Sequence, residues 1–152
     1  PEKNKLSYVS QTTLSIDDTK KIIDALKEKY PSIIGPKSDD ICYATQNRQE
    51  AVKKMLNKND LIFVIGSKNS SNSNRLLEIV KDKKIDAILL DDMSQFQTKW
   101  LNNKKNIGIT AGASAPEIIL KKIIKEIKKN KSVSISEIEG IKENIIFKLP
   151  KI

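Results

Sequence analysis

The sequence predicts an α/β fold in which a parallel sheet carries helices on both faces, and three observations lead to this prediction. Strand-like and helix-like stretches alternate along most of the 152 residues, which is the pattern of parallel sheets. The apolar run 61–65 is continuous and ends at Gly66, as expected of a strand buried on both faces. Hydrophobic residues make up 38% of the chain and charged residues 31%, which fits one ordinary globular core.

The N-terminal part is expected to contain one strand and one helix. Residues 5–9 are expected to form a short strand, and residues 11–13 a polar loop. Ser15, with Asp18 three residues later, resembles a capping signal for a helix that stops before Pro31. Four residues of this helix are expected to point inward: Ile22, Ile23, Leu26 and Tyr30.

The remaining elements continue the alternation. In chain order we expect a helix over 42–57, a strand over 61–65, a helix over 76–83, a strand over 87–90, a helix over 94–102, a strand over 107–109 and a helix over 116–129. Apolar residues alternate around Ile145 and Phe147. The tail 132–152 is therefore expected to end in a strand.

The polar loops of this fold predict where a ligand would bind. Loops that leave the carboxyl ends of parallel strands meet at one edge of the sheet, and ligands bind there. The loops around Thr12, Ser70 and Ser114 each follow an expected strand. We therefore expect these three loops to lie together at that edge.

Charge and hydropathy argue against two classes of partner. The net charge is +9, but the lysines are scattered and aromatic residues are only 5% of the chain, without the basic–aromatic interleaving that base stacking uses. The densest lysine run lies on the polar side of one expected helix and comprises Lys121, Lys122, Lys125, Lys128 and Lys129. We expect a solvated basic surface and no nucleic-acid partner. No apolar run approaches the roughly 18 residues that a membrane span needs, so no membrane partner is expected either.

Two of the loops have the composition of an anion site. The stretch 70–74 supplies hydroxyls and amides just after a buried strand and before a helix. Ser114 precedes Pro116 at a helix start, where backbone N–H groups are unpaired and can hold an anion. The alternatives are that Ser114 simply caps its own helix and that 70–74 is a low-complexity loop.

Cys42 is the only cysteine, and the chain has no histidine. At a helix start, the dipole and the free N–H groups favour a thiolate, which can be a nucleophile or a metal ligand. The alternative is an inert, small apolar residue. This chain alone can complete neither a Cys–His pair nor a thiolate metal site. A single cysteine also excludes an internal disulfide, which fits a reducing compartment.

Four stretches together resemble the LytB family of hydroxymethylbutenyl diphosphate reductases. They read SQTTLS at 10–15, DICYATQNRQ at 40–49, GSKNSSNS at 66–73 and GITAGASAPE at 108–117. Their order and spacing run as in the family across almost the whole chain. The resemblance implies an oxidoreductase that converts its substrate to isopentenyl and dimethylallyl diphosphates by reductive dehydroxylation, the last step of the non-mevalonate isoprenoid pathway.

The resemblance also implies roles for individual residues. Cys42 would be a ligand of a 4Fe-4S cluster. Thr12 and Gln11 would be catalytic, in the hydroxyl network around the substrate alcohol and the proton path. Four residues would bind the substrate diphosphate: Ser70, Ser71, Asn72 and Ser114.

The resemblance further implies that this chain is the C-terminal half of a three-subdomain α/β enzyme. Residues 1–38 would complete the middle subdomain, 39–130 would form the third, and 131–152 would be a tail packed back on the rest. The connector with Gly35 and Pro36 marks the first boundary. The missing N-terminal half would bring two more cysteines, substrate-binding histidines and a proton-delivering glutamate, so the chain alone is expected to be inactive.

The resemblance suggests ferredoxin or flavodoxin as the electron donor and the bacterial cytoplasm as the location, with a plastid-type organelle also compatible. A different class of function stays open from the residues themselves. A stand-alone α/β domain could bind a phosphosugar or other phosphorylated ligand in the same loops without redox chemistry. The sequence has no Gly-x-Gly-x-x-Gly or Walker-type lysine loop to favour a nucleotide.

Overall fold

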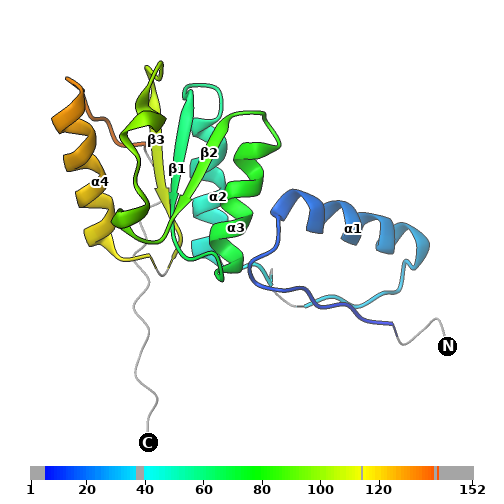
Figure 1. Ribbon diagram of the computed structural model, residues 1–152. Coiled ribbons are helices and arrows are strands. Elements are labelled where there is room, and N and C mark those ends of the chain that lie inside the picture. Colours follow the sequence, from blue (N-terminus) through cyan, green and yellow to red (C-terminus); the bar gives the residue numbers. More distant parts are fainter. Residues whose placement is uncertain (1–5, 37–39, 114, 139, 141–152) are drawn as a thin grey trace, which may run out of the picture.

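The computed structural model describes residues 6–36, 40–113, 115–138 and 140. At its centre is a three-stranded parallel sheet of order β2-β1-β3, formed by β1 (Leu61–Ile65), β2 (Asp86–Leu90) and β3 (Ile107–Ala111). All five residues of β1 are buried, because it is the central strand and both faces of the sheet are covered (Figure 1). The predicted α/β class with a parallel sheet is confirmed.

Two helices cover one face of the sheet. They are α2 (Tyr43–Met55) and α3 (Ser71–Lys81), which lie side by side on the side of the strands away from α4 in Figure 1. Alternate residues of β1, Ile62 and Val64, point to this face. Their buried partners are Val52, Met55, Leu56, Leu76 and Val80.

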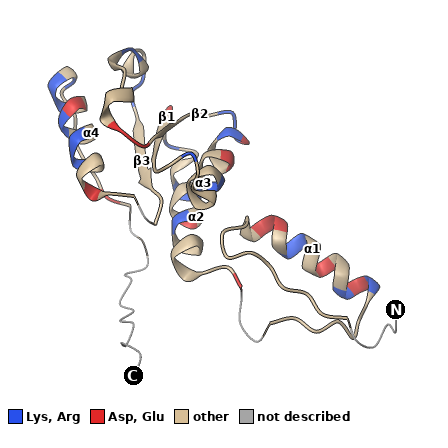
Figure 2. Ribbon diagram, turned by 60° about the horizontal axis from the view of Figure 1, so that its bottom comes forward, with Lys and Arg blue, Asp and Glu red and all other residues tan. Residues whose placement is uncertain are grey.

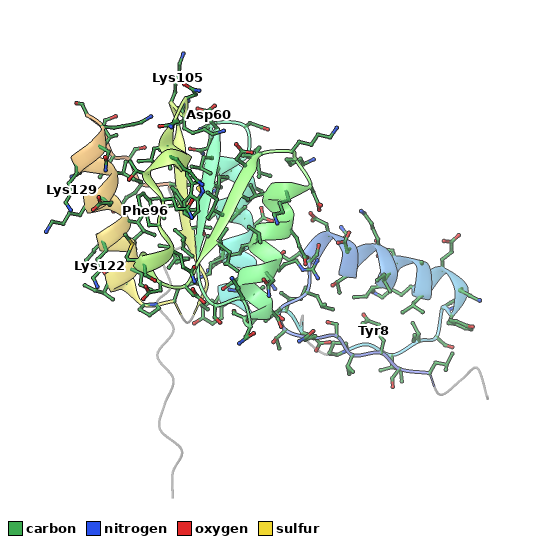
Figure 3. The ribbon with its side chains drawn as sticks, viewed as in Figure 1. Tyr8, Asp60, Phe96, Lys105, Lys122 and Lys129 are labelled. Carbon is green, nitrogen blue, oxygen red and sulfur yellow. The ribbon has the colours of Figure 1, made fainter. Side chains whose placement is uncertain are left out.

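The opposite face is covered by α4 (Glu117–Asn130) and by two short 3₁₀ helices, η2 (Met93–Gln95) and η3 (Thr98–Leu101). The core on this side contains Leu61, Phe63, Ile65, Leu90, Leu101, Ile123 and Ile127. Figure 3 shows Phe96 in the layer between the strands and α4. Helices on both faces of the sheet are therefore confirmed.

The single helix predicted over 94–102 is wrong. Phe96 and Gln97 are extended and separate η2 from η3. The break brings the rings of Phe96 and Trp100 to 5.8 Å and 6.2 Å from that of Phe63. Tertiary aromatic packing thus replaces the regular helix that the spacing of these two rings predicted.

The N-terminal segment carries α1 (Ile16–Lys29), which lies on the side of α2 and α3 away from α4 (Figure 1). Ser15 caps α1 as predicted, because its Oγ accepts from Asp18 N at 3.2 Å. The strand predicted over 5–9 is reduced, within the described residues, to a single parallel bridge between Ser7 and Ile34. Ile22, which was predicted to point inward, is 62% exposed, because nothing in the described chain covers that side of α1.

Other boundaries move by small amounts, with one exception. Helix α3 begins at Ser71, five residues before the predicted start, because Ser70 caps it. The strands β2 and β3 extend the predicted ranges by one and two residues. The tail strand predicted near Ile145 and Phe147 lies outside the described residues.

The surface carries many lysines, and Figure 2 shows them along α4 and at several helix ends. Lys122 and Lys129 point away from the sheet in Figure 3. Two lysines of α4 form ion pairs within the helix, Lys121 with Glu117 at 2.8 Å and Lys129 with Glu126 at 2.8 Å. Among the described residues, no helix is long and apolar enough to cross a membrane.

Candidate functional site

The candidate site is the edge of the sheet at which the strands end. Helices α2, α3 and α4 each run antiparallel to the strands, so their amino ends gather at this edge (Figure 1). Two glycines continue the hydrogen-bond ladder past the strands: Gly66 N donates to Leu90 O at 2.9 Å, and Gly112 N donates to Ile65 O at 2.8 Å. Unpaired helix N–H groups make such an edge favourable for anions.

The first turn of α3 brings the predicted diphosphate-binding residues to this edge. Ser70 is the N-cap, and its Oγ accepts from Ser73 N at 3.3 Å. Because that hydroxyl oxygen accepts from the helix, its hydrogen stays available to donate to a ligand. Ser71 is the first residue of the helix and is exposed. The loop before the cap is braced by Asn74, whose Nδ2 donates to Lys68 O at 2.7 Å.

The side chain of Asn72 is buried and has no hydrogen-bond partner among the described residues. Its side chain is 7% exposed, and neither Nδ2 nor Oδ1 has a hydrogen-bond partner in the described part of the chain. Burying an unsatisfied amide typically costs about 1–3 kcal/mol per group. A native protein keeps such a group where a ligand or water satisfies it. The amide of Asn72 is therefore available to form hydrogen bonds with a polar ligand.

Ser73 lies next to Asn72, is also buried, and was not predicted as a site residue. It is 1% exposed, and its Oγ likewise has no hydrogen-bond partner among the described residues. A Cβ added at Gly66 would lie 2.1 Å from this Oγ, and one at Gly112 would lie 2.4 Å from it. The hydroxyl of Ser73 thus fills the space that these two glycines leave. The sequence offered one signal, a glycine shortly after each of two expected strands: Gly66 after 61–65 and Gly112 after 107–109.

Cys42 lies at the amino end of α2. It is the N-cap of that helix, it is exposed, and it forms no side-chain capping bond. Its Sγ lies 3.1 Å from Thr45 Oγ1. The backbone N–H of Cys42 donates to Thr12 O at 3.3 Å. The predicted metal ligand and the predicted catalytic threonine are therefore brought together.

The loop of Thr12 is held by a residue that sequence reasoning missed. Gln49 on α2 is 1% exposed, and its amide accepts from Ile16 N at 3.1 Å and donates to Leu14 O at 2.8 Å. These two bonds fix the loop against the helix that Cys42 begins. Gln11 and Thr12 are themselves exposed, so their side chains are accessible to a substrate.

The third predicted loop is described except for its key residue. Ser114 lies outside the described residues. On either side of it, Ala115 N donates to Gly112 O at 3.0 Å, and Pro116 is the N-cap of α4. The side chain of Pro116 makes no capping hydrogen bond to the amino end of α4.

Hydrogen bonds lower the pKa of two carboxyl groups, one at the opposite edge of the sheet and one at the amino end of α4. At the opposite edge, backbone N–H groups of Asn106 and Lys105 lower the pKa of Asp60, and Figure 3 shows Asp60 and Lys105 close together there. On α4, the hydrogen bond from Lys121 lowers the pKa of Glu117. Within the described ranges, no three His, Cys, Asp or Glu residues are grouped to hold a metal ion. Cys42, the one cysteine of the sequence, could supply a single thiolate to a metal.

Comparison with known proteins decides the family. Residues 1–128 match the family described as LytB protein. The chain belongs to the LytB family.

Two relatives of this LytB chain carry the same name. It is 51% identical over 154 residues to the 4-hydroxy-3-methylbut-2-enyl diphosphate reductase of Nitrosomonas europaea, covering 97% of this chain and 48% of that protein. It is 53% identical over 150 residues to the enzyme of the same name from Haemophilus influenzae, covering 99% of this chain and 48% of the relative. The LytB chain therefore spans about half the length of the curated relatives that it matches.

Solved structures agree with the LytB assignment. The E-1-hydroxy-2-methyl-but-2-enyl-4-diphosphate reductase from Plasmodium falciparum superposes with a TM-score of 0.76 at 40% identity, over 82% of this chain and 39% of that chain. A second structure, described as (E)-4-hydroxy-3-methyl-but-2-enyl diphosphate reductase, the terminal enzyme of the non-mevalonate pathway, gives a TM-score of 0.56 at 31% identity. It covers 81% of this chain and 43% of that chain.

Proposed function

We propose that this chain works as the C-terminal portion of a 4-hydroxy-3-methylbut-2-enyl diphosphate reductase. The reaction removes the substrate hydroxyl as water, with two electrons and two protons, and gives isopentenyl and dimethylallyl diphosphates. The names of the relatives support the reaction. The observation that carries the proposal is the buried amide of Asn72, which has no hydrogen-bond partner among the described residues and lies at the amino end of α3.

The diphosphate end of the substrate is proposed to bind at the edge where the strands end. Asn72 Nδ2 would donate to a phosphate oxygen, which would satisfy a group that the described chain leaves unpaired. Ser70 would donate through the hydrogen that its cap bond leaves available, and Ser71 would contribute from the exposed first position of α3. Ser114 would complete the site from the loop before α4. Hydrogen bonds to charged oxygens are the stronger kind, which suits a diphosphate.

The cofactor proposed for this enzyme is a 4Fe-4S cluster, and one residue of this chain fits it. Cys42 is exposed and free of a disulfide, and it stands at a helix N-terminus, where a thiolate is favoured. When bound, the cluster would supply the electrons and an open iron for the substrate oxygen. The chain's own task is to present the Cys42 thiolate, with the Thr45 hydroxyl 3.1 Å from its sulfur.

The alcohol end of the substrate is proposed to meet Thr12 and Gln11. Both residues are exposed, and the backbone of Thr12 is fixed to Cys42 by a hydrogen bond of 3.3 Å. A hydroxyl held there can donate to the leaving oxygen or accept a proton for relay to it. This arrangement would place proton transfer next to the thiolate that binds the cluster.

The chain is proposed to need the other half of the enzyme. The relatives are about twice as long, and the other half would bring the remaining cluster ligands, the substrate-binding histidines and the proton-donating glutamate. We assign residues 1–38 to the end of the middle subdomain, 39–130 to the third subdomain and 131–152 to a tail that packs back on the enzyme. Ferredoxin or flavodoxin is the proposed electron donor, and the bacterial cytoplasm is the proposed location.

The test is turnover without oxygen. The enzyme that contains both halves is given 4-hydroxy-3-methylbut-2-enyl diphosphate and a chemical one-electron reductant, and the products are separated and identified. We expect both isoprenoid diphosphates, and none from the Cys42→Ser variant. An enzyme that binds no iron and makes neither product, yet binds phosphosugars tightly, would instead support a phosphate-binding domain without redox chemistry.

A further inference from the structure

The hydroxyl of Ser73 lies where three parts of the candidate site meet. Ser73 belongs to the first turn of α3, and its Oγ fills the space beside both Gly66 and Gly112. Gly66 directly follows β1 and begins the loop to Ser70, whereas Gly112 directly follows β3 and begins the loop to α4. One side chain thus contacts the start of both loops to which diphosphate binding is assigned.

The contact with Gly112 depends on the hydroxyl oxygen. A Cβ at Gly112 would lie 2.4 Å from Ser73 Oγ, a distance that real Cβ atoms essentially never show. The next atoms that it would meet are Asn72 Nδ2 and Ile65 O, both at 3.7 Å, which is ordinary contact. Among the described residues, the Ser73 oxygen is therefore the one atom too close to allow a Cβ at Gly112.

The contact with Gly66 is different. A Cβ there would lie 2.1 Å from Ser73 Oγ and also 2.8 Å from Ser73 Cβ. Gly66 has a φ of 157°, a conformation that side chains rarely adopt. Removing the hydroxyl would therefore not make room for a side chain at Gly66. A Cβ at Gly112 is thus excluded by the Ser73 oxygen. A Cβ at Gly66 is excluded by that oxygen and is also disfavoured by the backbone conformation.

We propose that Ser73 is a positioning residue, which sets the distance between the two diphosphate-binding loops by contacting Gly66 and Gly112. This inference rests on the proposed function, because it concerns the diphosphate site. The oxygen acts as a spacer that fixes the first turn of α3 against the end of β3. Its effect on substrate passes through Asn72, the adjacent residue, whose amide lies 3.7 Å from the position of a Cβ at Gly112.

The experiment compares single and double variants of the enzyme that contains both halves. Gly112→Ala should raise the KM for the diphosphate substrate by about tenfold, because the new methyl group meets the Ser73 oxygen, which must shift and so disturbs the first turn of α3. Ser73→Ala together with Gly112→Ala should return the KM to within about twofold of wild type, since the methyl group then occupies the space of the lost oxygen. The kcat and the iron content should stay unchanged throughout.

Two further variants serve as controls. Gly66→Ala should not be rescued by Ser73→Ala, because its Cβ also meets Ser73 Cβ. Gly140→Ala should be silent, because a Cβ there meets nothing within 4 Å. If Gly112→Ala does not fold, the double variant is compared directly with wild type. The proposal predicts that the double variant folds and binds substrate.

Three results would overturn the proposal. The first is a Gly112→Ala variant with a wild-type KM. The second is a double variant that is no better than Gly112→Ala, or that does not fold. The third is a Ser73→Ala variant that binds inorganic pyrophosphate as weakly as Asn72→Ala, which would make Ser73 a direct ligand. Turnover by the wild-type enzyme tests the proposed function separately. A failure of the proposed function can therefore be distinguished from a failure of the role proposed for Ser73.

Discussion

The side-chain amide of Gln49 donates a hydrogen bond to the carbonyl oxygen of Leu14, 2.8 Å away and 35 positions earlier in the chain. The same amide accepts from the N–H of Ile16 at 3.1 Å. One buried glutamine thus fixes the loop of Thr12 to the helix that begins at Cys42. The residues proposed for proton transfer and for cluster binding are held together by the protein even without the cluster.

Replacing Gln49 by Ala should destabilise the fold. The change leaves Leu14 O and Ile16 N without partners and opens a small cavity, so the free energy of unfolding should fall by about 2–4 kcal/mol. Urea unfolding measures it, with Gln97→Ala as the control at an exposed glutamine. Equal stability of the two variants would mean that the Gln49 bonds do not hold the loop.

Replacing Asn72 by Ala should separate stability from binding. Both amide atoms are buried and without partners in the described chain, so their removal should leave the unliganded protein as stable as before or more stable. Affinity for the diphosphate substrate should fall by about tenfold to a hundredfold, which corresponds to about 1–3 kcal/mol. Calorimetry measures affinity, and Asn57→Ala, exposed near the end of α2, is the control. Unchanged affinity in the Asn72 variant would remove this residue from the site.

Replacing Cys42 by Ser should strip or convert the proposed cluster. Cys42 is a single potential ligand of this chain, and a hydroxyl binds iron more weakly than a thiolate does. Iron and sulfide per enzyme, measured without oxygen, should fall below wild type, and turnover should be lost. Thr45→Val is the control for the neighbouring hydroxyl, 3.1 Å from the sulfur, and it should keep the iron. Normal iron in the Cys42→Ser variant would contradict the assignment.

Stability should depend on pH through Asp60. Its Oδ2 accepts from Lys105 N and Asn106 N, both at 2.9 Å, and these bonds lower its pKa in the folded state. A lowered pKa means stability that is present above the ordinary value, about 3.9, and is lost as pH falls through the lower folded value. Asp60→Asn should therefore flatten the loss of stability below about pH 4.

Thermal unfolding between neutral and acid pH checks this, with Asp82→Asn as the control at an exposed carboxylate. If both variants lose the same part of the pH dependence, general charge repulsion explains it and Asp60 has no special part.

Most of the fold could be predicted because strand and helix patterns alternate along the chain and the central strand is a continuous apolar run. The apolar run 61–65 has one reading, a strand buried on both faces, and β1 is that strand. The early start of α3 was missed because runs of serine and asparagine favour turns over helix interiors. In the structure Ser70 caps the helix, and the residues that follow it, including Ser73 at the sheet edge, already belong to its first turn. The break near Phe96 was missed because aromatic spacing alone does not show contact with Phe63.

The residue types of the site could be predicted from the sequence, but the contacts between its residues could not. Serines, an asparagine and a lone cysteine at helix starts indicate anion and metal chemistry. The roles of Ser73 and Gln49 depend on partners far along the chain, since Gly112 lies 39 positions after Ser73 and Leu14 lies 35 before Gln49. No local pattern encodes those distances. The same limit applies to Ile22, because periodicity gives a helix face but not what covers it.

The most direct test of the account is a crystal structure, obtained without oxygen, of the enzyme that contains both halves with its diphosphate substrate bound. The distance that matters joins Asn72 Nδ2 to the nearest phosphate oxygen. We expect a hydrogen bond of about 2.8–3.0 Å, with the diphosphate at the amino end of α3. A diphosphate bound elsewhere, with the Asn72 amide still unpaired, would contradict the central claim.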